Sequence, residues 1–203
     1  MKRLTSVLVS SVIVAGCSSS ISVDSDSSRG FLCIPSEFEV SVQGSGNSND
    51  GFDPEGGGYD SSIVLDGKYV VQAIQGYKAR VRVGKSEQRQ SLYVMLAPKS
   101  HFQRSLSEIN PTHPLDEHER LFGETADSLT WEVLEKVDDK FTHWGTCADQ
   151  FVDPKSFDCQ RILAINDLVL TYTLDQANLH LYQQIDDLLR KKVDRWRCEA
   201  SDI

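Results

Sequence analysis

Apolar and polar residues alternate along several short stretches of the chain, which is the pattern of strands with one buried face. The clearest are residues 36–43 (SEFEVSVQ), 77–83 (YKARVRV) and 91–97 (SLYVMLA). Pro98 follows the third stretch and is expected to end it. These stretches predict that the first half of the chain is rich in β-structure.

Two dipeptides mark expected turns between such runs. Asp66-Gly67 stands inside SIVLDGKYVV and is typical of a type I′ hairpin. With this turn, residues 62–97 are expected to form a meander of four antiparallel strands. Asn166-Asp167 separates two apolar runs within residues 159–174 and predicts a second hairpin.

Residues 128–147 (SLTWEVLEKVDDKFTHWGTC) fit both structural periods. Apolar residues that alternate from Leu129 suit a strand, whereas apolar residues spaced by three and four up to Trp144 suit a helix. We interpret the segment as two strands with a turn near Asp138-Asp139, and a helix remains the alternative.

The C-terminal segment, residues 176–197, predicts an amphipathic helix. Its apolar stripe consists of Tyr182, Ile185, Leu189, Val193 and Trp196. Asp186 and Asp187 precede Arg190 and Lys191 by four residues, so we expect these charges on the exposed side.

Together these elements predict a single α+β domain over residues 31–203. We expect an antiparallel sheet of hairpins with the C-terminal amphipathic helix packed on one face. A domain of this size buries about 70% of its unfolded surface, which is enough for a hydrophobic core.

The first residues have the layout of a signal peptide. Lys2 and Arg3 precede residues 4–15, which are apolar or small and carry no acidic side chain. This run is shorter than the roughly 20 residues that span a bilayer. Residues 14–17 (VAGC) then resemble the bacterial lipobox. That resemblance implies that residues 1–16 are removed and that Cys17 is acylated, which gives a stable membrane anchor.

The residue after Cys17 is Ser18 rather than aspartate. Similarity to Gram-negative lipoproteins implies sorting to the outer membrane, with the domain on the periplasmic face. Seven of the twelve residues 18–29 are serine, so we interpret residues 17–30 as a lipidated, flexible tether.

Charge excludes some partners of the mature protein. The full chain has a formal net charge of −9, and removal of Lys2 and Arg3 with the signal peptide lowers it to −11. An acidic protein is a poor candidate for binding nucleic acid or an anionic membrane surface.

Four further cysteines remain when Cys17 is lipidated: Cys33, Cys147, Cys159 and Cys198. An even number in an oxidising compartment favours two disulfides, with three connectivities allowed. Cys147 and Cys159 enclose a short loop and are the first expected pair, which leaves Cys33 with Cys198. No Cys-x-x-Cys spacing occurs, so we expect no zinc site and no other metal.

Residues 44–59 are rich in glycine and acidic residues, and they raise the question of calcium. An EF-hand loop counted from Asn47 would need a glycine at its sixth position and a glutamate at its twelfth, but those positions are Phe52 and Gly58. We interpret the segment as a surface loop that contacts a partner through aromatic and acidic side chains. The candidate residues are Asp50, Phe52, Asp53, Glu55 and Tyr59.

The sequence contains no Gly-x-Ser-x-Gly, no His-Glu-x-x-His and no phosphate loop. His113 and His118 are five residues apart, a spacing that does not place both on one helix face, so we expect surface histidines rather than ligands. We therefore expect no catalytic residues and no cofactor, and the protein is not expected to be an enzyme.

The two ends of the chain resemble small periplasmic lipoproteins associated with type VI secretion effectors. The resemblance lies in the Cys-x-Pro of FLCIPSEFEV and in the strand-then-helix ending of LVLTYTL and YQQIDDLLRKKVDRWRC. It implies a binding protein that gives immunity to one secreted antibacterial effector. An accessory lipoprotein of an envelope complex is the alternative, followed by a periplasmic enzyme.

Overall fold

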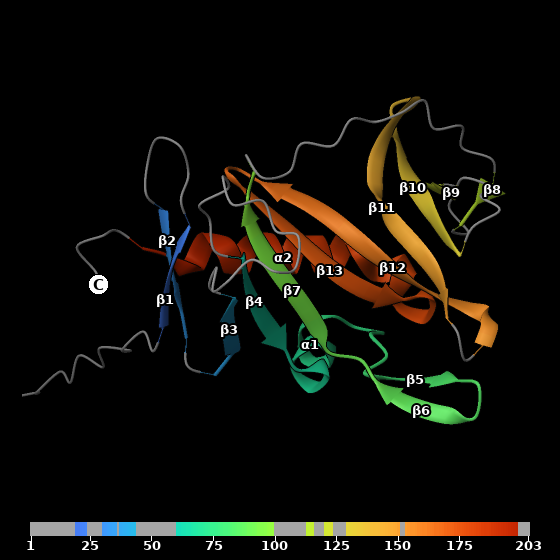
Figure 1. Ribbon diagram of the computed structural model, residues 1–203, viewed down its shortest axis with the longest axis horizontal. Helices are drawn as coiled ribbons and strands as arrows, with labels where there is room; N and C mark the ends of the chain where they lie inside the picture. Colours follow the sequence, from blue (N-terminus) through green and yellow to red (C-terminus); the bar gives the residue numbers. More distant parts are fainter. Residues whose placement is uncertain are drawn as a thin grey trace, which may run out of the picture.

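The structure is a computed structural model that describes residues 19–23, 30–35, 37–43, 60–99, 113–115, 120–123, 129–150 and 153–198. Its main feature is a large antiparallel sheet crossed by one long helix (Figure 1). The predicted α+β class, with an antiparallel sheet and a C-terminal helix, is confirmed.

Within the described residues, nine strands form this sheet in the order β3-β4-β7-β13-β12-β11-β10-β9-β8. They are β3 (Glu39–Gln43), β4 (Asp60–Leu65), β7 (Leu92–Pro98), β8 (His113–Pro114), β9 (Leu121–Gly123), β10 (Thr130–Val137), β11 (Lys140–Gln150), β12 (Asp153–Ile165) and β13 (Leu168–Asp175).

Two smaller sheets flank the large one. One has the order β1-β2-β14 and joins the two ends of the described chain; the other is the β5–β6 hairpin. Their strands are β1 (Ser19–Val23), β2 (Gly30–Ile34), β14 (Arg197–Cys198), β5 (Arg80–Val83) and β6 (Ser86–Arg89).

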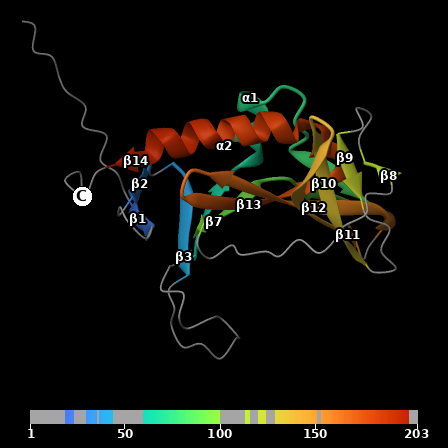
Figure 2. The ribbon, with the colours of Figure 1, turned by 90° about the horizontal axis from the view of Figure 1, so that it is seen from above.

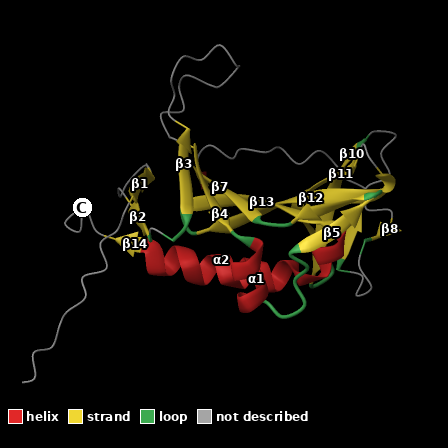
Figure 3. Ribbon diagram, turned by 90° about the horizontal axis from the view of Figure 1, so that it is seen from below, coloured by secondary structure: helices red, strands yellow, loops and turns green. Residues whose placement is uncertain are grey.

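Helix α2 (Tyr182–Trp196) lies along one face of the large sheet, and α1 (Gly67–Ala73) lies on the same side (Figures 2 and 3). A 3-10 helix, η2 (Gln176–Leu181), leads into α2. The predicted helix over 176–197 is therefore correct in position but begins with a tighter turn. The predicted apolar stripe is buried in the core from Tyr182 to Trp196.

The β10–β11 pair confirms the two-strand interpretation of residues 128–147. The turn lies at Asp138 and Asp139, both of which have a positive φ, of 47° and 61°. The hairpin at Asn166-Asp167 is confirmed as well, since β12 and β13 pair from Ile165 and Leu168 outward.

The predicted hairpin at Asp66-Gly67 is wrong. Asp66 caps α1 instead: its carboxylate accepts a hydrogen bond from the backbone N–H of Lys68 at 2.8 Å. A side chain at Gly67 would collide with the carbonyl oxygen of Gln90, so glycine serves close packing here.

The four-strand meander over residues 62–97 is wrong for the same reason. β4 continues into α1, and β5–β6 forms a separate sheet, so that β4 pairs directly with β7. The alternation in residues 77–83 is nevertheless confirmed, because Val81 and Val83 are buried while Arg80 and Arg82 are exposed.

Part of the predicted tether is a strand, because β1 occupies residues 19–23 and pairs with β2. Ile21 and Val23 alternate with serine there, and β-branched residues suit strands. Sequence analysis missed this strand because the segment was interpreted from its high serine content alone.

Near its C-terminal end, α2 packs against neighbouring elements through a lysine surrounded by aromatic rings. The ammonium of Lys192 lies 4.7 Å from the ring centre of Phe38, 4.8 Å from that of Tyr69 and 5.7 Å from that of Trp196. Such cation–π contacts, with the edge-on packing of Phe38 against the other two rings, join α2 to α1 and to the start of β3.

Candidate functional site

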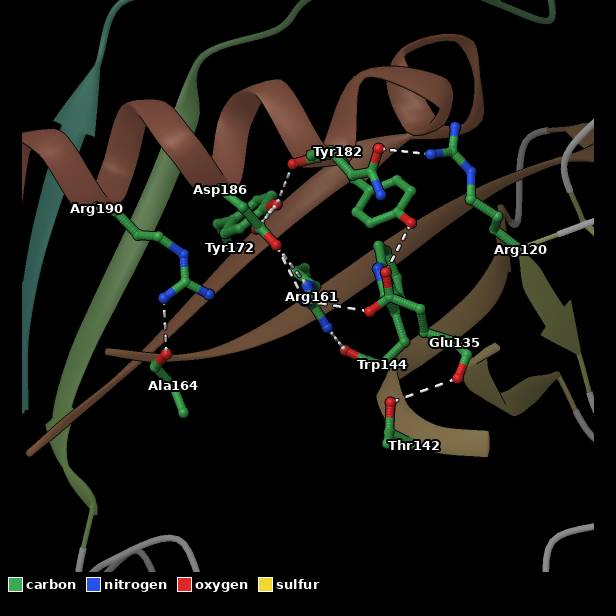
Figure 4. A network of polar contacts seen from close by, with 11 residues as sticks. Arg120, Glu135, Thr142, Trp144, Arg161, Ala164, Tyr172, Tyr182, Asp186 and Arg190 are labelled. Carbon is green, nitrogen blue, oxygen red and sulfur yellow. Dashed lines mark hydrogen bonds and ion pairs between the residues drawn. The ribbon is translucent and has the colours of Figure 1, made fainter. Parts of the chain in front are cut away.

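A buried ion pair links α2 to the sheet (Figure 4). The guanidinium of Arg161 on β12 donates from Nη2 and Nε to Oδ2 of Asp186, at 2.9 and 3.3 Å. Its Nη1 donates to the backbone carbonyl of Trp144 at 3.0 Å. Both charged side chains are only 10% exposed. The expectation that Asp186 lies on the exposed side of the helix is therefore wrong.

Two tyrosines extend this network. The hydroxyl of Tyr172 donates to Oδ1 of Asp186 at 2.6 Å, and that of Tyr182 donates to Oε1 of Glu135 at 2.8 Å. Glu135 Oε2 lies 3.7 Å from Nη2 of Arg161. Burial, reinforced by the neighbouring carboxylates, raises the pKa of both tyrosine hydroxyls. Both tyrosines thus stay protonated as hydrogen-bond donors at neutral pH.

The geometry of this network suits a structural role. Arg161 also stacks near Trp144 and Tyr182, with its guanidinium carbon 5.2 and 6.0 Å from the ring centres. Its charge is balanced by Asp186 and Glu135, and each tyrosine hydroxyl has an acceptor. Satisfied in this way, the network fixes α2 over β10, β12 and β13. Sequence reasoning missed it because its members come from five separate elements, which are β10, β11, β12, β13 and α2.

A second carboxylate contact lies on the β10–β11 pair. Nε2 of His143 is 2.6 Å from Oε2 of Glu132, and the hydroxyl of Thr146 donates to the same oxygen at 3.4 Å. Among the residues with described positions, no group of three or more His, Cys, Asp or Glu side chains is arranged to hold a metal ion.

The cysteine predictions are confirmed in part. Cys147 and Cys159 stand directly opposite each other on β11 and β12 and form a disulfide, with both residues buried. Cys33 is also disulfide-bonded. The side chains of Cys17 and Cys198 lie outside those described, so the Cys33–Cys198 pairing stays a prediction.

The residues predicted to contact a partner lie outside the described residues: Asp50, Phe52, Asp53, Glu55 and Tyr59. The two positions that bracket their loop are described. Gln43 at the end of β3 pairs with Asp60 at the start of β4. His113 lies in β8, and His118 is outside the described part of the chain.

An exposed apolar surface lies on β7, next to β4. Tyr93 and Met95 on β7 are 63% and 49% exposed. Leu92, Val94 and Leu96, which alternate with them along the strand, are buried. Because side chains alternate along a strand, Tyr93 and Met95 point away from the face that α2 covers. Met95 pairs with Ser62, two residues from Asp60. The Met95 end of the β7 surface thus lies near the start of β4.

Comparison of the chain with protein-family models, with curated proteins and with solved structures found no match. None of the helices in the described residues is long and apolar enough to cross a bilayer.

Proposed function

We propose that this protein is a lipid-anchored binding protein of the periplasm that inhibits one secreted protein partner. The proposal joins the lipobox at Cys17 with the immunity-type resemblance of the two chain ends. The anchor is acylated Cys17 in the outer membrane, and the second disulfide joins Cys33 to Cys198.

The observation that carries the proposal is the exposure of Tyr93 and Met95 in the middle of a sheet. Tyrosine and methionine are enriched at protein interfaces, and the adjoining strands provide a rigid base for them. Val64 and Ala97 on the same face are partly buried and extend the apolar surface. The segment 44–59, with its predicted contact residues, follows β3 and precedes β4 in the chain, and β4 is the strand next to β7.

The buried network supports a binding role rather than a catalytic one. Arg161 and Asp186 have their charges balanced by each other, and both tyrosine hydroxyls point at carboxylates. A rigid core of this kind holds the sheet in one shape, and a preorganised surface loses less entropy when it binds.

The test is recovery of the partner from cells of origin after mild cross-linking, with the tagged full chain and two variants. We expect one stoichiometric secreted protein with the wild type. Alanine at both Tyr93 and Met95 should weaken its binding about 100-fold, as for interface anchors. Leu129→Ala is the matched control, since Leu129 is 61% exposed and lies directly before β10, four strands away from β7 in the sheet.

Other outcomes separate the alternatives. Recovery of several envelope components would favour the accessory lipoprotein. An equal loss of partner binding from Leu129→Ala and from the double variant would contradict a binding role for the β7 surface. Unchanged binding after deletion of residues 47–58 would rule out a role for that segment in partner binding. Cys17→Ser should release the protein from the membrane fraction without changing its affinity for the partner.

A further inference from the structure

A small cavity lies between the start of α1 and the β5–β6 hairpin, which projects from the body of the molecule (Figure 1). Its volume is about 140 Å³. It is lined by Asp66, Gly67, Lys68, Ala79, Arg80, Arg89, Gln90 and Ser91. That is room for roughly four or five water molecules, and much less than the roughly 300 Å³ of the smallest drug-sized pockets.

Two hydrogen bonds join residues that line the cavity. The N–H of Gln90 donates to the carbonyl of Ala79 at 2.9 Å, and the N–H of Gly67 donates to the hydroxyl of Ser91 at 3.3 Å. Gly67 packs so closely on Gln90 that no side chain fits between them. These contacts hold the ends of the β5–β6 hairpin against the start of α1.

The rim of the cavity is basic. Arg80 and Arg89 stand directly opposite each other on β5 and β6, and like charges in such a pair repel. Lys68 adds a third positive charge. Two carboxylates lie nearby: Asp66 accepts the Lys68 N–H at 2.8 Å, and Glu87 forms an ion pair with Arg80 at 3.0 Å.

The surrounding segment has the opposite charge to the rest of the molecule. Residues 77–90 carry five basic side chains and one acidic one, in a chain whose formal net charge is −9. Arg80 and Arg89 both line the cavity and occupy opposed positions on the hairpin, so two positive charges lie at its rim. An anion between them would replace repulsion with two charge-assisted hydrogen bonds.

We propose that this cavity binds a small phosphate-bearing anion, held by Arg89, Arg80 and Lys68. Guanidinium groups fit phosphate oxygens in a bidentate manner, and the volume admits one such group rather than a nucleotide. Free phosphate and the phosphate of a lipid head group share this chemistry. The inference is independent of the partner surface on β7.

The test measures binding of inorganic phosphate to the mature chain with Cys17→Ser, which lacks the acylation site. Calorimetry and thermal unfolding are run against sodium chloride of equal ionic strength. We expect phosphate to raise the melting temperature of this chain and Arg89→Gln to weaken phosphate binding about tenfold. Arg82→Gln is the matched control, because Arg82 lies on the same hairpin with the same charge but does not line the cavity.

A second arm separates the two sources of phosphate. Phosphatidylcholine vesicles with and without phosphatidic acid are offered to the same three proteins. Phosphatidic acid-dependent binding that Arg89→Gln loses and Arg82→Gln keeps assigns the site to a lipid head group; phosphate binding without it assigns the site to the free anion. Equal effects of the two substitutions, or no difference between phosphate and chloride, would overturn the proposal.

Discussion

A pair of oppositely charged residues is buried in the core of the molecule. Arg161 and Asp186 are buried between α2 and β12, where an unpaired charge would be costly. The carboxylate of Asp186 is occupied from both sides, by Arg161 and by the hydroxyl of Tyr172. Its removal therefore takes a charged acceptor from both donors, which keep only the backbone carbonyls of Tyr182 and Trp144 within hydrogen-bond distance.

Replacement of Asp186 should expose this dependence. We expect Asp186→Asn to lower the free energy of unfolding by about 3 kcal/mol, since the carboxylate that remains near Arg161, that of Glu135, is more distant at 3.7 Å. Asp187→Asn is the control one position along the helix, where the side chain is exposed, and should change stability by less than about 0.5 kcal/mol. Urea denaturation measures both.

A second variant distinguishes pairing from packing. Arg161→Met combined with Asp186→Leu removes both charges at similar volume and should cost less than the sum of the two single substitutions. Equal costs for Asp186→Asn and Asp187→Asn would mean that the ion pair does not stabilise the fold.

The position of Asp186 could not be predicted from its neighbours in the sequence. The stripe from Tyr182 to Trp196 correctly gives the buried face of α2, and Asp186 follows Ile185 at the border of that stripe. Local spacing offered Arg190 as its partner. The actual partner, Arg161, is 25 residues away and comes from another strand.

At the scale of elements, turn dipeptides correctly predicted hairpins where the residues on both sides form strands. Asn166-Asp167 and Asp138-Asp139 both close hairpins. Asp66-Gly67 carries the same kind of signal but begins a helix, because aspartate also caps helices and Gly67 packs against Gln90. The local sequence allows both structures, and a contact with residue 90 decides between them.

The β10–β11 turn makes the conformational cost of its residues measurable. Asp139 has a φ of 61°, in the left-handed region, which costs a non-glycine residue about 1 kcal/mol. We therefore expect Asp139→Gly to raise the free energy of unfolding by up to about 1 kcal/mol. This gain exceeds the loss of the exposed ion pair with Lys136 at 3.3 Å, which is worth little.

The control for that turn is Asp139→Ala. It removes the same ion pair but keeps a Cβ, so it should not stabilise the protein. Thermal unfolding of the two variants separates the effects, and a gain from alanine equal to that from glycine would contradict the backbone explanation.

At the scale of the whole molecule, the sequence predicts the class but not the order of the strands. The alternation of apolar and polar residues and the apolar stripe of the C-terminal segment predict one sheet with a helix on one face. They could not show that β4 pairs with β7 across α1 and the β5–β6 hairpin, or that β14 joins β2 near the other end of the chain. Such pairings depend on contacts between distant segments, which no local pattern encodes.

The candidate site was predictable only in part for the same reason. Residues 91–97 were recognised as a strand, but which of its faces the helix covers is a property of the assembled sheet. Tyr93 and Met95 are exposed because α2 packs against the opposite side. The basic cavity likewise requires α1, which forms where the sequence had predicted a hairpin instead.

The Cys147–Cys159 disulfide gives a last prediction about the molecule as a unit. Both cysteines are almost fully buried, at 1% and 0% exposure, between the central strands β11 and β12. A reductant can reach the bond only when these strands separate, so its reduction should follow global unfolding. Loss of the bond, which closes a loop of 12 residues, should cost about 3 kcal/mol.

Alkylation and mass spectrometry of the peptides that carry Cys147 and Cys159 measure this directly. In dithiothreitol without denaturant we expect the pair to stay oxidised, and to be reduced across the same urea range in which the protein unfolds. Alanine at both cysteines should shift the urea midpoint down by the amount that corresponds to about 3 kcal/mol. Rapid reduction in the absence of urea would show that β11 and β12 separate locally, and would contradict a sheet that unfolds as one unit with α2.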